Sequence, residues 1–209
     1  KQLETIAALA ERFSLGELRA THNQNIVLTD VIESALMELW QQAKESALAT
    51  PTIGTINDMI CCPGGDYCSL ANAKSIPVAE AIQRKFSDLD YVYDLGDLEL
   101  NISGCMNACG HHHVGHIGIL GVDKKGKEWY QIQLGGSASK NASLAKVLIV
   151  ASSPASGNGG SAEAKATRVR TVVSPLSRER ARPPPPALPP PTAPPYRRAI
   201  TLPDALNLF

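Results

Sequence analysis

Four of the five cysteines are grouped in two pairs, and this grouping constrains the fold more than any other feature of the chain. Cys62 and Cys68 form a Cys-x5-Cys motif, and Cys105 and Cys109 form a Cys-x3-Cys motif. Glycine and proline surround both motifs, as expected where backbone wraps closely around a compact inorganic group. Thiolates grouped in this way bind soft metals, above all iron–sulfur clusters. The remaining cysteine, Cys61, is expected to be a spare buried thiol rather than a fifth ligand.

The bulk properties suit a globular protein of one or two domains. The chain has 209 residues, of which 44% are hydrophobic. No run of 18 apolar residues occurs, so we expect no membrane span and no membrane partner. The chain begins in a helical pattern with neither an initiator Met nor a signal peptide, so we expect a fragment. Five cysteines in such a length do not make a secreted disulfide scaffold, so we expect a cytoplasmic protein. We expect no nucleic-acid partner.

Charge and proline content divide the chain into two kinds of polypeptide. Residues 1–150 carry 12 Lys and Arg against 17 Asp and Glu, whereas residues 151–209 carry 8 against 3. The second part also holds 12 of the 15 prolines. Its composition favours a disordered tail, because it has too few large apolar groups to offset the entropy of ordering. Two alternatives are a polyproline ligand for Pro-binding domains and out-of-frame coding sequence.

The first 48 residues have the content of a half ferredoxin-like unit. Helical spacing predicts helices over residues 3–13 and 32–47, and two short strands are expected at 17–22 and 25–28. The second helix should present one apolar face, made of Ile32, Leu36, Leu39 and Trp40. The order helix, strand, strand, helix is that of half a ferredoxin-like fold.

Residues 49–150 are expected to form a mixed α/β domain that carries the cysteines. A helix is predicted from about Ser69 to Phe86, with Pro77 as a break or restart. The expected strands are 98–103, 116–122 and 128–134, the last two joined by a hairpin at Asp-Lys-Lys-Gly-Lys, and residues 144–150 form a helix or a strand. The predicted fold class is therefore α+β, with domains at 1–48 and 49–150 and a tail at 151–209.

The two cysteine motifs together resemble those of the sirohaem-containing sulfite and nitrite reductases, in the C-terminal half of the enzyme. The second motif, Gly-Cys-Met-Asn-Ala-Cys-Gly, begins its cysteine pair 37 positions after Cys68. Residues 16–28, 115–122 and 130–138 also resemble the family. The similarity covers about residues 1–148 and leaves out the tail.

The resemblance implies a cofactor set and a role for several residues. Cys62, Cys68, Cys105 and Cys109 would bind a four-iron four-sulfur cluster, and Cys109 would also bridge to the iron of sirohaem. Asn107 would lie near the sirohaem as a hydrogen-bond donor, or serve as a turn residue between two ligands. The cofactors would carry out a six-electron reduction with electrons from ferredoxin or a flavoprotein.

The resemblance favours sulfite over nitrite as the substrate, on the residues that follow Cys109. The catalytic residues are unknown, because the substrate-binding Arg and Lys residues are expected in an N-terminal half that this sequence lacks. Residues 1–150 are net acidic, whereas sirohaem carries many carboxylates. We therefore expect the chain alone to bind sirohaem poorly.

Other residues have a possible functional role beside a structural one. The histidines are candidates for cofactor contact or for a zinc site, or are polar residues at the start of a strand; they are His111, His112, His113 and His116. The family-like segment 16–28 resembles a repeated motif of the family and is expected to be mainly structural here; its polar residues are Arg19, Thr21, Asn23, Gln24 and Asn25. Lys124, Lys125 and Lys127 are expected in a solvated turn, and Gly135 and Gly136 in a tight turn or a close backbone approach.

Three other functions are compatible with the same motifs. One is an electron carrier that holds a cluster without sirohaem. Another is a structural zinc module, although its cysteine spacings would be unusual. The third is an inactive, truncated gene product.

Overall fold

The structure, a computed structural model, describes residues 1–152 and 198–202. Contacts between these residues define two compact units: residues 1–53 with 198–202, and residues 54–152. Each helix in this part of the chain is too short or too polar to cross a lipid bilayer.

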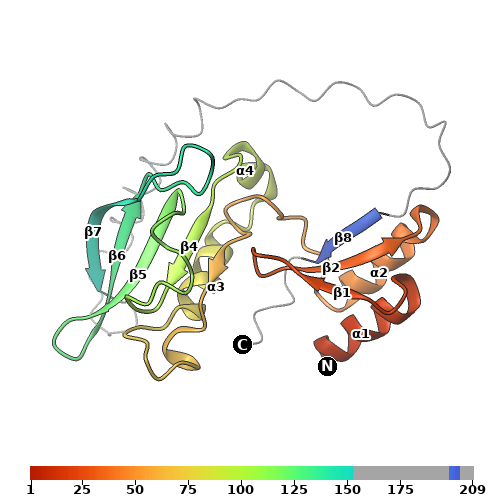
Figure 1. Cartoon of the computed structure of the whole chain (residues 1–209), viewed down its shortest axis with the longest axis horizontal. Coiled ribbons are helices and arrows are strands. Elements are labelled where there is room, and N and C mark those ends of the chain that lie inside the picture. The colour runs from red at the N-terminus through yellow and green to blue at the C-terminus, as the bar shows by residue number, and fades with distance from the viewer. Residues whose placement is uncertain (153–197, 203–209) are drawn as a thin grey trace. The chain divides into compact units, whose positions relative to one another are not determined.

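The first unit is a three-stranded antiparallel sheet with two helices packed on one face (Figure 1). Its elements are α1 (Gln2–Phe13), β1 (Leu18–Ala20), β2 (Ile26–Val31), the 3-10 turn η1 (Glu33–Ala35), α2 (Leu36–Glu45) and β8 (Arg198–Leu202). β2 is the central strand and pairs with β1 on one side and β8 on the other. The order helix, strand, strand, helix confirms the prediction of a half ferredoxin-like unit.

A bulge in β2 aligns the core of this unit. Leu28 and Val31 are fully buried in the same apolar cluster, although residues three apart in a regular strand point to opposite faces. Asp30 lies between them with φ +56°, where the register of β2 shifts. The extra residue turns Val31 inward. The buried apolar set is Ile6, Leu9, Leu28, Val31, Leu39, Ala43 and Leu48. Ile32 and Trp40 were expected on the same apolar face as Leu39, which is wrong, since they are 48% and 47% exposed.

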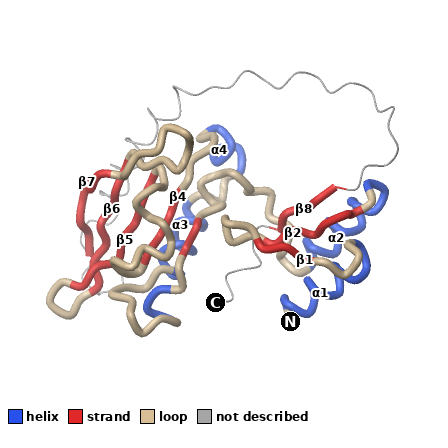
Figure 2. Tube along the Cα trace, in the orientation of Figure 1, coloured by secondary structure: helices blue, strands red, loops and turns tan. Residues whose placement is uncertain are grey.

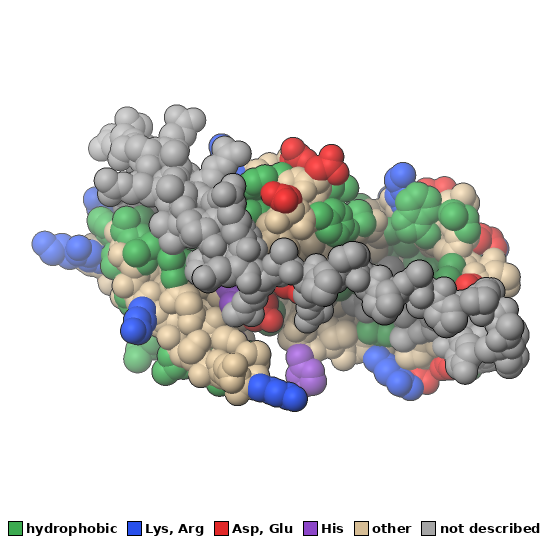
Figure 3. Space-filling model, turned by 90° about the horizontal axis from the view of Figure 1, so that it is seen from above, with side chains coloured by type: hydrophobic (Ala, Val, Ile, Leu, Met, Phe, Trp, Pro, Cys, Tyr) green, Lys and Arg blue, Asp and Glu red, His purple; other side chains and the backbone are tan. Residues whose placement is uncertain are grey.

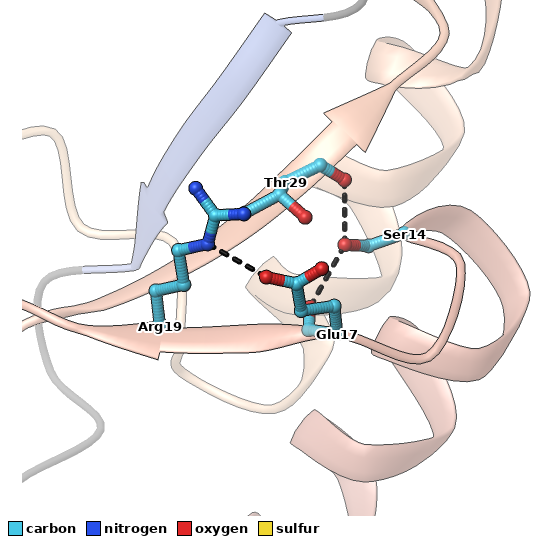
Figure 4. Close-up of polar contacts among 4 residues, drawn as sticks. All are labelled: Ser14, Glu17, Arg19 and Thr29. Atoms are coloured by element: carbon cyan, nitrogen blue, oxygen red, sulfur yellow. Dashed lines mark hydrogen bonds and ion pairs between the residues drawn. The ribbon is translucent and has the colours of Figure 1, made fainter.

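The link between α1 and β1 is held by one buried hydroxyl (Figure 4). The Ser14 side chain is fully buried, and its Oγ donates to the carbonyl of Thr29 at 2.6 Å and lies 3.0 Å from the carbonyl of Glu17. Nearby, the Arg19 guanidinium donates to the Glu17 carboxylate at 2.7 Å on the exposed surface. Ser14 thus connects the end of α1 to the central strand of the sheet.

The tail contributes one strand that the sequence analysis did not anticipate. β8 pairs antiparallel with β2, with residue 200 opposite Leu28. Apart from residues 151–152 and this strand, the tail predicted at 151–209 lies outside the described residues, and so does its Pro-rich segment.

The second unit is built on a five-stranded mixed sheet in the order β3-β4-β5-β6-β7 (Figure 2). Its elements are β3 (Ile60–Cys61), the 3-10 turn η2 (Gly64–Asp66), α3 (Ile76–Lys85), α4 (Leu89–Asp94), β4 (Leu100–Ser103), β5 (Ile117–Asp123), β6 (Glu128–Leu134) and β7 (Lys146–Ser152). β3, β4 and β5 are parallel, whereas β5, β6 and β7 are antiparallel. Apolar residues of α3 and α4, among them Ala79 and Val92, share one core with Ile102 and Ile117 of the sheet.

Local sequence patterns predicted most of this unit, with one error and two omissions. The β5–β6 hairpin is confirmed, and Lys125 and Gly126 have the positive φ values that its tight turn requires. The helix expected from Ser69 begins instead at Ile76, with Pro77 in its first turn, where the missing amide costs nothing. The short strand β3 and the helix α4, which is capped by Asp88, were not predicted.

Candidate metal centre

Two neighbouring parallel strands deliver the two cysteine motifs to the same edge of the sheet. β3 pairs with β4 so that Cys61 lies opposite Ile102, and the amide of Cys62 donates to the carbonyl of Ile102 at 3.1 Å. Cys62 directly follows β3, and Cys105 lies two residues after the end of β4. Because parallel strands end at a common edge, both cysteine loops start side by side.

A direct hydrogen bond joins the two loops at a cysteine sulfur. The amide of Gly104 donates to Sγ of Cys62 at 3.0 Å, across 42 residues of sequence. Gly104 directly precedes Cys105 in the sequence. The bond therefore connects Cys62, the first proposed ligand, to the residue next to Cys105, the third proposed ligand. Both cysteines are buried, each with 8% exposure. An amide directed at sulfur stabilises the thiolate form, which is the form that binds metal.

Glycine is required where the loops meet. A Cβ on Gly104 would lie 2.7 Å from the carbonyl oxygen of Ala73 and 2.9 Å from Cα of Gly64. Gly64 itself has φ +61°, and its carbonyl accepts from the amide of Cys68 at 2.9 Å. The amide of Ala73 donates to the carbonyl of Gly104 at 3.0 Å. These contacts hold the loop of Cys62 and Cys68 against the start of the second motif.

The second motif turns sharply between its two cysteines. Ala108 has φ +57°, an uncommon conformation for a residue other than glycine, and its amide donates to the carbonyl of Cys105 at 3.2 Å. The amide of Gly110 donates to the buried hydroxyl of Ser103 at 3.1 Å. Backbone held in such a conformation is frequent where a loop binds a ligand.

The remaining cysteines are more accessible. Cys68 is half-buried and Cys109 is exposed, as is Asn107 between the members of the second pair. All five cysteines are free thiols, so each ligand candidate is available to a metal. The convergence of all four sulfurs on one cluster, and the contact of Asn107 with sirohaem, remain predictions.

Cys61 differs from its neighbour Cys62. Burial, and next the proximity of Cys62, raise the pKa of Cys61 to about 12. Its side chain packs against the core of the unit, and its Sγ lies 3.3 Å from the carbonyl of Cys62. A thiol that stays protonated is a poor metal ligand. These observations support the expectation that Cys61 is a spare buried thiol.

The four histidines that follow the second cysteine motif have different environments. His111 is exposed, and Nδ1 of His116 accepts from the amide of Glu99 at 3.1 Å. His112 is buried with 6% exposure, and among the described residues its Nδ1 has no hydrogen-bond partner. Burial, and next the proximity of His113, lower the pKa of His112. His112 is therefore neutral near pH 7.

The other candidate residues have structural surroundings. The amide of Asn25 donates to Oγ1 of Thr21 at 3.0 Å, which closes the turn between β1 and β2. A Cβ on Gly136 would lie 2.4 Å from the carbonyl oxygen of Gly115, so this glycine permits a close backbone approach. Lys124 lies in the β5–β6 hairpin with Nζ 4.7 Å from the ring centroid of Trp129.

The cysteine and histidine side chains do not form a site for a single ion. Among residues 1–152, no group of three or more Cys, His, Asp or Glu side chains could hold one metal ion. A zinc site needs all its ligands within about 2.0–2.3 Å of one ion. In a four-iron cluster each cysteine binds a different iron, so its sulfurs lie further apart.

Basic side chains do not gather on the face of the molecule drawn in Figure 3. The Lys and Arg residues visible there, among those that the structure describes, stand apart from one another. A cofactor with many carboxylates needs several cations close together. Among the described residues that remain visible in this view, no such group is seen.

Two protein-family models together match most of the described chain. Residues 1–46 match the nitrite/sulfite reductase ferredoxin-like half domain, and residues 54–169 match the nitrite and sulphite reductase 4Fe-4S domain. The cysteine loops thus lie within the second match.

Individual relatives are longer than this chain. The chloroplastic ferredoxin–nitrite reductase of Spinacia oleracea is 29% identical over 70% of this chain and 25% of its own length. The protein named sulfite reductase [ferredoxin] 2 of Mycolicibacterium paratuberculosis is 26% identical over 70% of this chain and 28% of its own length. The chain thus spans about a quarter of the length of these relatives.

A solved structure shares the fold. The Mycobacterium tuberculosis NirA protein superposes with a TM-score of 0.60 and 23% identity, over 72% of this chain and 30% of that chain. The α+β fold class is confirmed by this likeness and by the match to the half domain. Because a family model matches more than half of its residues, this chain belongs to the nitrite and sulfite reductase family.

Proposed function

We propose that Cys62, Cys68, Cys105 and Cys109 bind one [4Fe-4S] cluster in the C-terminal part of a sirohaem-dependent sulfite reductase. The observation that carries the proposal is the 3.0 Å hydrogen bond from the Gly104 amide to Sγ of Cys62, which joins the two cysteine loops. In this proposal residues 1–48 are a half ferredoxin-like domain and residues 49–150 are the cluster and sirohaem domain.

The chemistry of the donor set fits the cluster. All four residues are free thiols on two loops that leave the same edge of the sheet. The Gly104 amide stabilises one of the thiolates, and the burial of Cys62 and Cys105 keeps water from that side of the site. Cys61, with its raised pKa, is the one cysteine that the proposal leaves without iron.

The exposure of Cys109 supports its role as the bridge to sirohaem. A residue that also held sirohaem would have to be accessible at the surface, and Cys109 is the exposed member of the set. When bound, the cluster and sirohaem supply the redox chemistry of a six-electron reduction. The residues of this chain position the two groups and keep the cluster side of the site dry.

The proposal also specifies the substrate, the electron donor and the compartment. We propose sulfite, reduced to sulfide, with a ferredoxin or a flavoprotein as the electron donor, in a reducing compartment such as the cytoplasm. Nitrite is the second candidate, because the relatives include ferredoxin–nitrite reductases at 28–29% identity. Residues that bind the oxyanion are proposed to lie in a region equivalent to the part of these relatives that this chain does not span, which is about three quarters of their length.

The cluster assignment is tested on the full 209-residue chain. Anaerobic reconstitution with iron and sulfide should give four irons and four acid-labile sulfides per chain. Separate Cys-to-Ala changes at the four ligand positions should each abolish or strongly reduce cluster content. Cys61→Ala is the matched control and should keep the full content. One zinc without sulfide, or a loss in the control equal to that in the ligand variants, would contradict the assignment.

A second experiment addresses sirohaem and substrate. The reconstituted chain is mixed with sirohaem and the visible spectrum is recorded, first alone and then with the N-terminal segment of a family member added. We expect stable sirohaem binding only with the added segment, because residues 1–150 are net acidic. Activity of that mixture with sulfite and with nitrite then decides between the two substrates. Tight sirohaem binding by the chain alone would show that the added segment is not needed.

A further inference from the structure

A serine that begins a helix does not use its side chain to cap it. Ser75 is the N-cap residue of α3, yet its side chain makes no capping hydrogen bond to the helix. Serine is favoured at this position because its hydroxyl usually accepts from an amide of the first turn, which stabilises a helix by about 1 kcal/mol. The Ser75 hydroxyl therefore has a different use.

The hydroxyl of Ser75 is directed at a cysteine sulfur instead. Ser75 has 0% exposure, and its Oγ lies 3.5 Å from Sγ of Cys62. Cys62 as a thiolate has no proton to give, so Ser75 is the donor in this pair. The Gly104 amide already donates to the same sulfur. Two donors from separate segments thus converge on one proposed cluster ligand.

Two glycines make room for this hydroxyl, and two hydrogen bonds fix the backbone that carries it. A Cβ on Gly64 would lie 2.6 Å from Oγ of Ser75, and a Cβ on Gly104 would lie 3.0 Å from it. The carbonyl of Ser75 accepts from the amides of Val78 and Ala79 at 3.1 and 3.0 Å, which fixes the start of the helix. The hydroxyl therefore fills the space that the two glycines leave beside Cys62.

We propose that Ser75 is a positioning residue that raises the reduction potential of the cluster through its hydrogen bond to Cys62. The inference rests on the proposed cluster function. Reduction adds one electron, taken from a one-electron donor, and no bond is formed or broken. Part of the added negative charge falls on the thiolates, so a donor to sulfur stabilises the reduced state more than the oxidised state.

The test is a redox titration of the reconstituted full chain. Dithionite is the reductant, and electron paramagnetic resonance of the reduced cluster gives the midpoint potential. We expect Ser75→Ala and Ser75→Gly to shift the potential to a more negative value, and Ser75→Thr, which keeps a hydroxyl, to stay near the original. Ser69→Ala is the matched control, since Ser69 is exposed in the same connecting segment, and should leave the potential unchanged.

The other outcomes also decide the question. A loaded Ser75→Ala cluster with the original potential would overturn the proposal. If Ala and Gly variants fail to load while Thr and the Ser69 control load fully, the hydroxyl is required to position Cys62, which supports it. If the Thr variant also fails, packing rather than the hydroxyl is what matters, and the proposal is wrong. Failure of the unsubstituted chain to load would refute the proposed function instead.

Discussion

The hydroxyl of Tyr130 donates a 2.8 Å hydrogen bond to the carbonyl of Lys74, and so connects β6 to the segment that leads from Cys68 to α3. Tyr130 is buried with 7% exposure, and its hydroxyl also lies 3.4 Å from the Glu128 carboxylate. Burial is the main cause that raises the pKa of Tyr130, so the hydroxyl keeps its proton and remains a donor. The residue next to Lys74 is Ala73, which bonds to Gly104. Tyr130 of the β5–β6 hairpin thus anchors the segment between Cys68 and α3, which contacts the cysteine loops.

Removal of that hydroxyl should destabilise the second unit. We expect Tyr130→Phe to lower the free energy of unfolding by about 1–2 kcal/mol, because the carbonyl of Lys74 loses its donor in a half-buried place. Urea denaturation followed by circular dichroism measures the change. Tyr67→Phe is the control, since Tyr67 is 72% exposed in the first cysteine loop. Equal stability of the two variants would contradict the structural role of Tyr130.

A methyl group at Gly104 should disrupt the contact between the cysteine loops. The added Cβ would lie 2.7 Å from a backbone carbonyl oxygen, so one of the two segments must move. We expect Gly104→Ala to lose most of its cluster content on reconstitution. Gly65→Ala, in the first cysteine loop, is the control, because the nearest atom to its added Cβ would be 3.5 Å away. Iron and sulfide analysis of both variants is the measurement, and full loading of Gly104→Ala would be the contrary result.

The buried hydroxyl of Ser14 should contribute measurably to the first unit. Ser14→Ala leaves the carbonyl of Thr29 without its side-chain donor, and we expect a loss of about 1 kcal/mol in the free energy of unfolding. Ser34→Ala on the exposed surface should change stability by less than about 0.5 kcal/mol. Chemical denaturation of both variants gives the comparison; a Ser14 variant as stable as the Ser34 variant would count against this contact.

A substitution at Thr29, in strand β2, should not lower the free energy of unfolding and should raise it slightly if it changes it. Thr29 is buried, and among the described residues its Oγ1 has no hydrogen-bond partner. Thr29→Val keeps the shape and removes the unsatisfied hydroxyl, so we expect stability to be unchanged or to rise by about 1 kcal/mol. Thermal denaturation checks it. A marked loss of stability would mean that the hydroxyl has a partner after all.

Acid should destabilise the second unit partly through His112. Its pKa is lowered in the folded chain, so below about pH 6.5 the unfolded chain binds more protons than the folded chain. The contribution of neutral His112 to the free energy of unfolding is therefore fully present above about pH 6.5. It is lost as the pH falls through the lowered pKa of His112. We expect urea denaturation of the cluster-free chain to show lower stability at pH 5.5 than at pH 7.5. His112→Gln should reduce this difference, whereas His111→Gln, at an exposed position, should not.

Local patterns in the sequence were enough for the parts of the fold that depend on neighbours in the chain. Helix α1, the strands β1 and β2 and the β5–β6 hairpin follow from local residue patterns, among them the turn residues Lys125 and Gly126. The grouping of the cysteines and their surrounding glycines likewise predicted a family, and the comparisons confirm it. The helix, the strands and the hairpin are predictable because each depends on residues a few positions apart. The family was recognised from two motifs that lie 37 positions apart.

Contacts between distant segments were decided only by the tertiary structure. The parallel pairing of β3 with β4 brings the Gly104 amide to Cys62 across 42 residues, and no local pattern marks a two-residue strand such as β3. The hydroxyl of Ser75, the N-cap residue of α3, lies 3.5 Å from Sγ of Cys62 and does not cap the helix, which no local pattern indicates. β8 joins β2 from the far end of the chain. Such pairings depend on the free energy of the whole fold, in which burial and hydrogen bonding outweigh the local preferences of each segment.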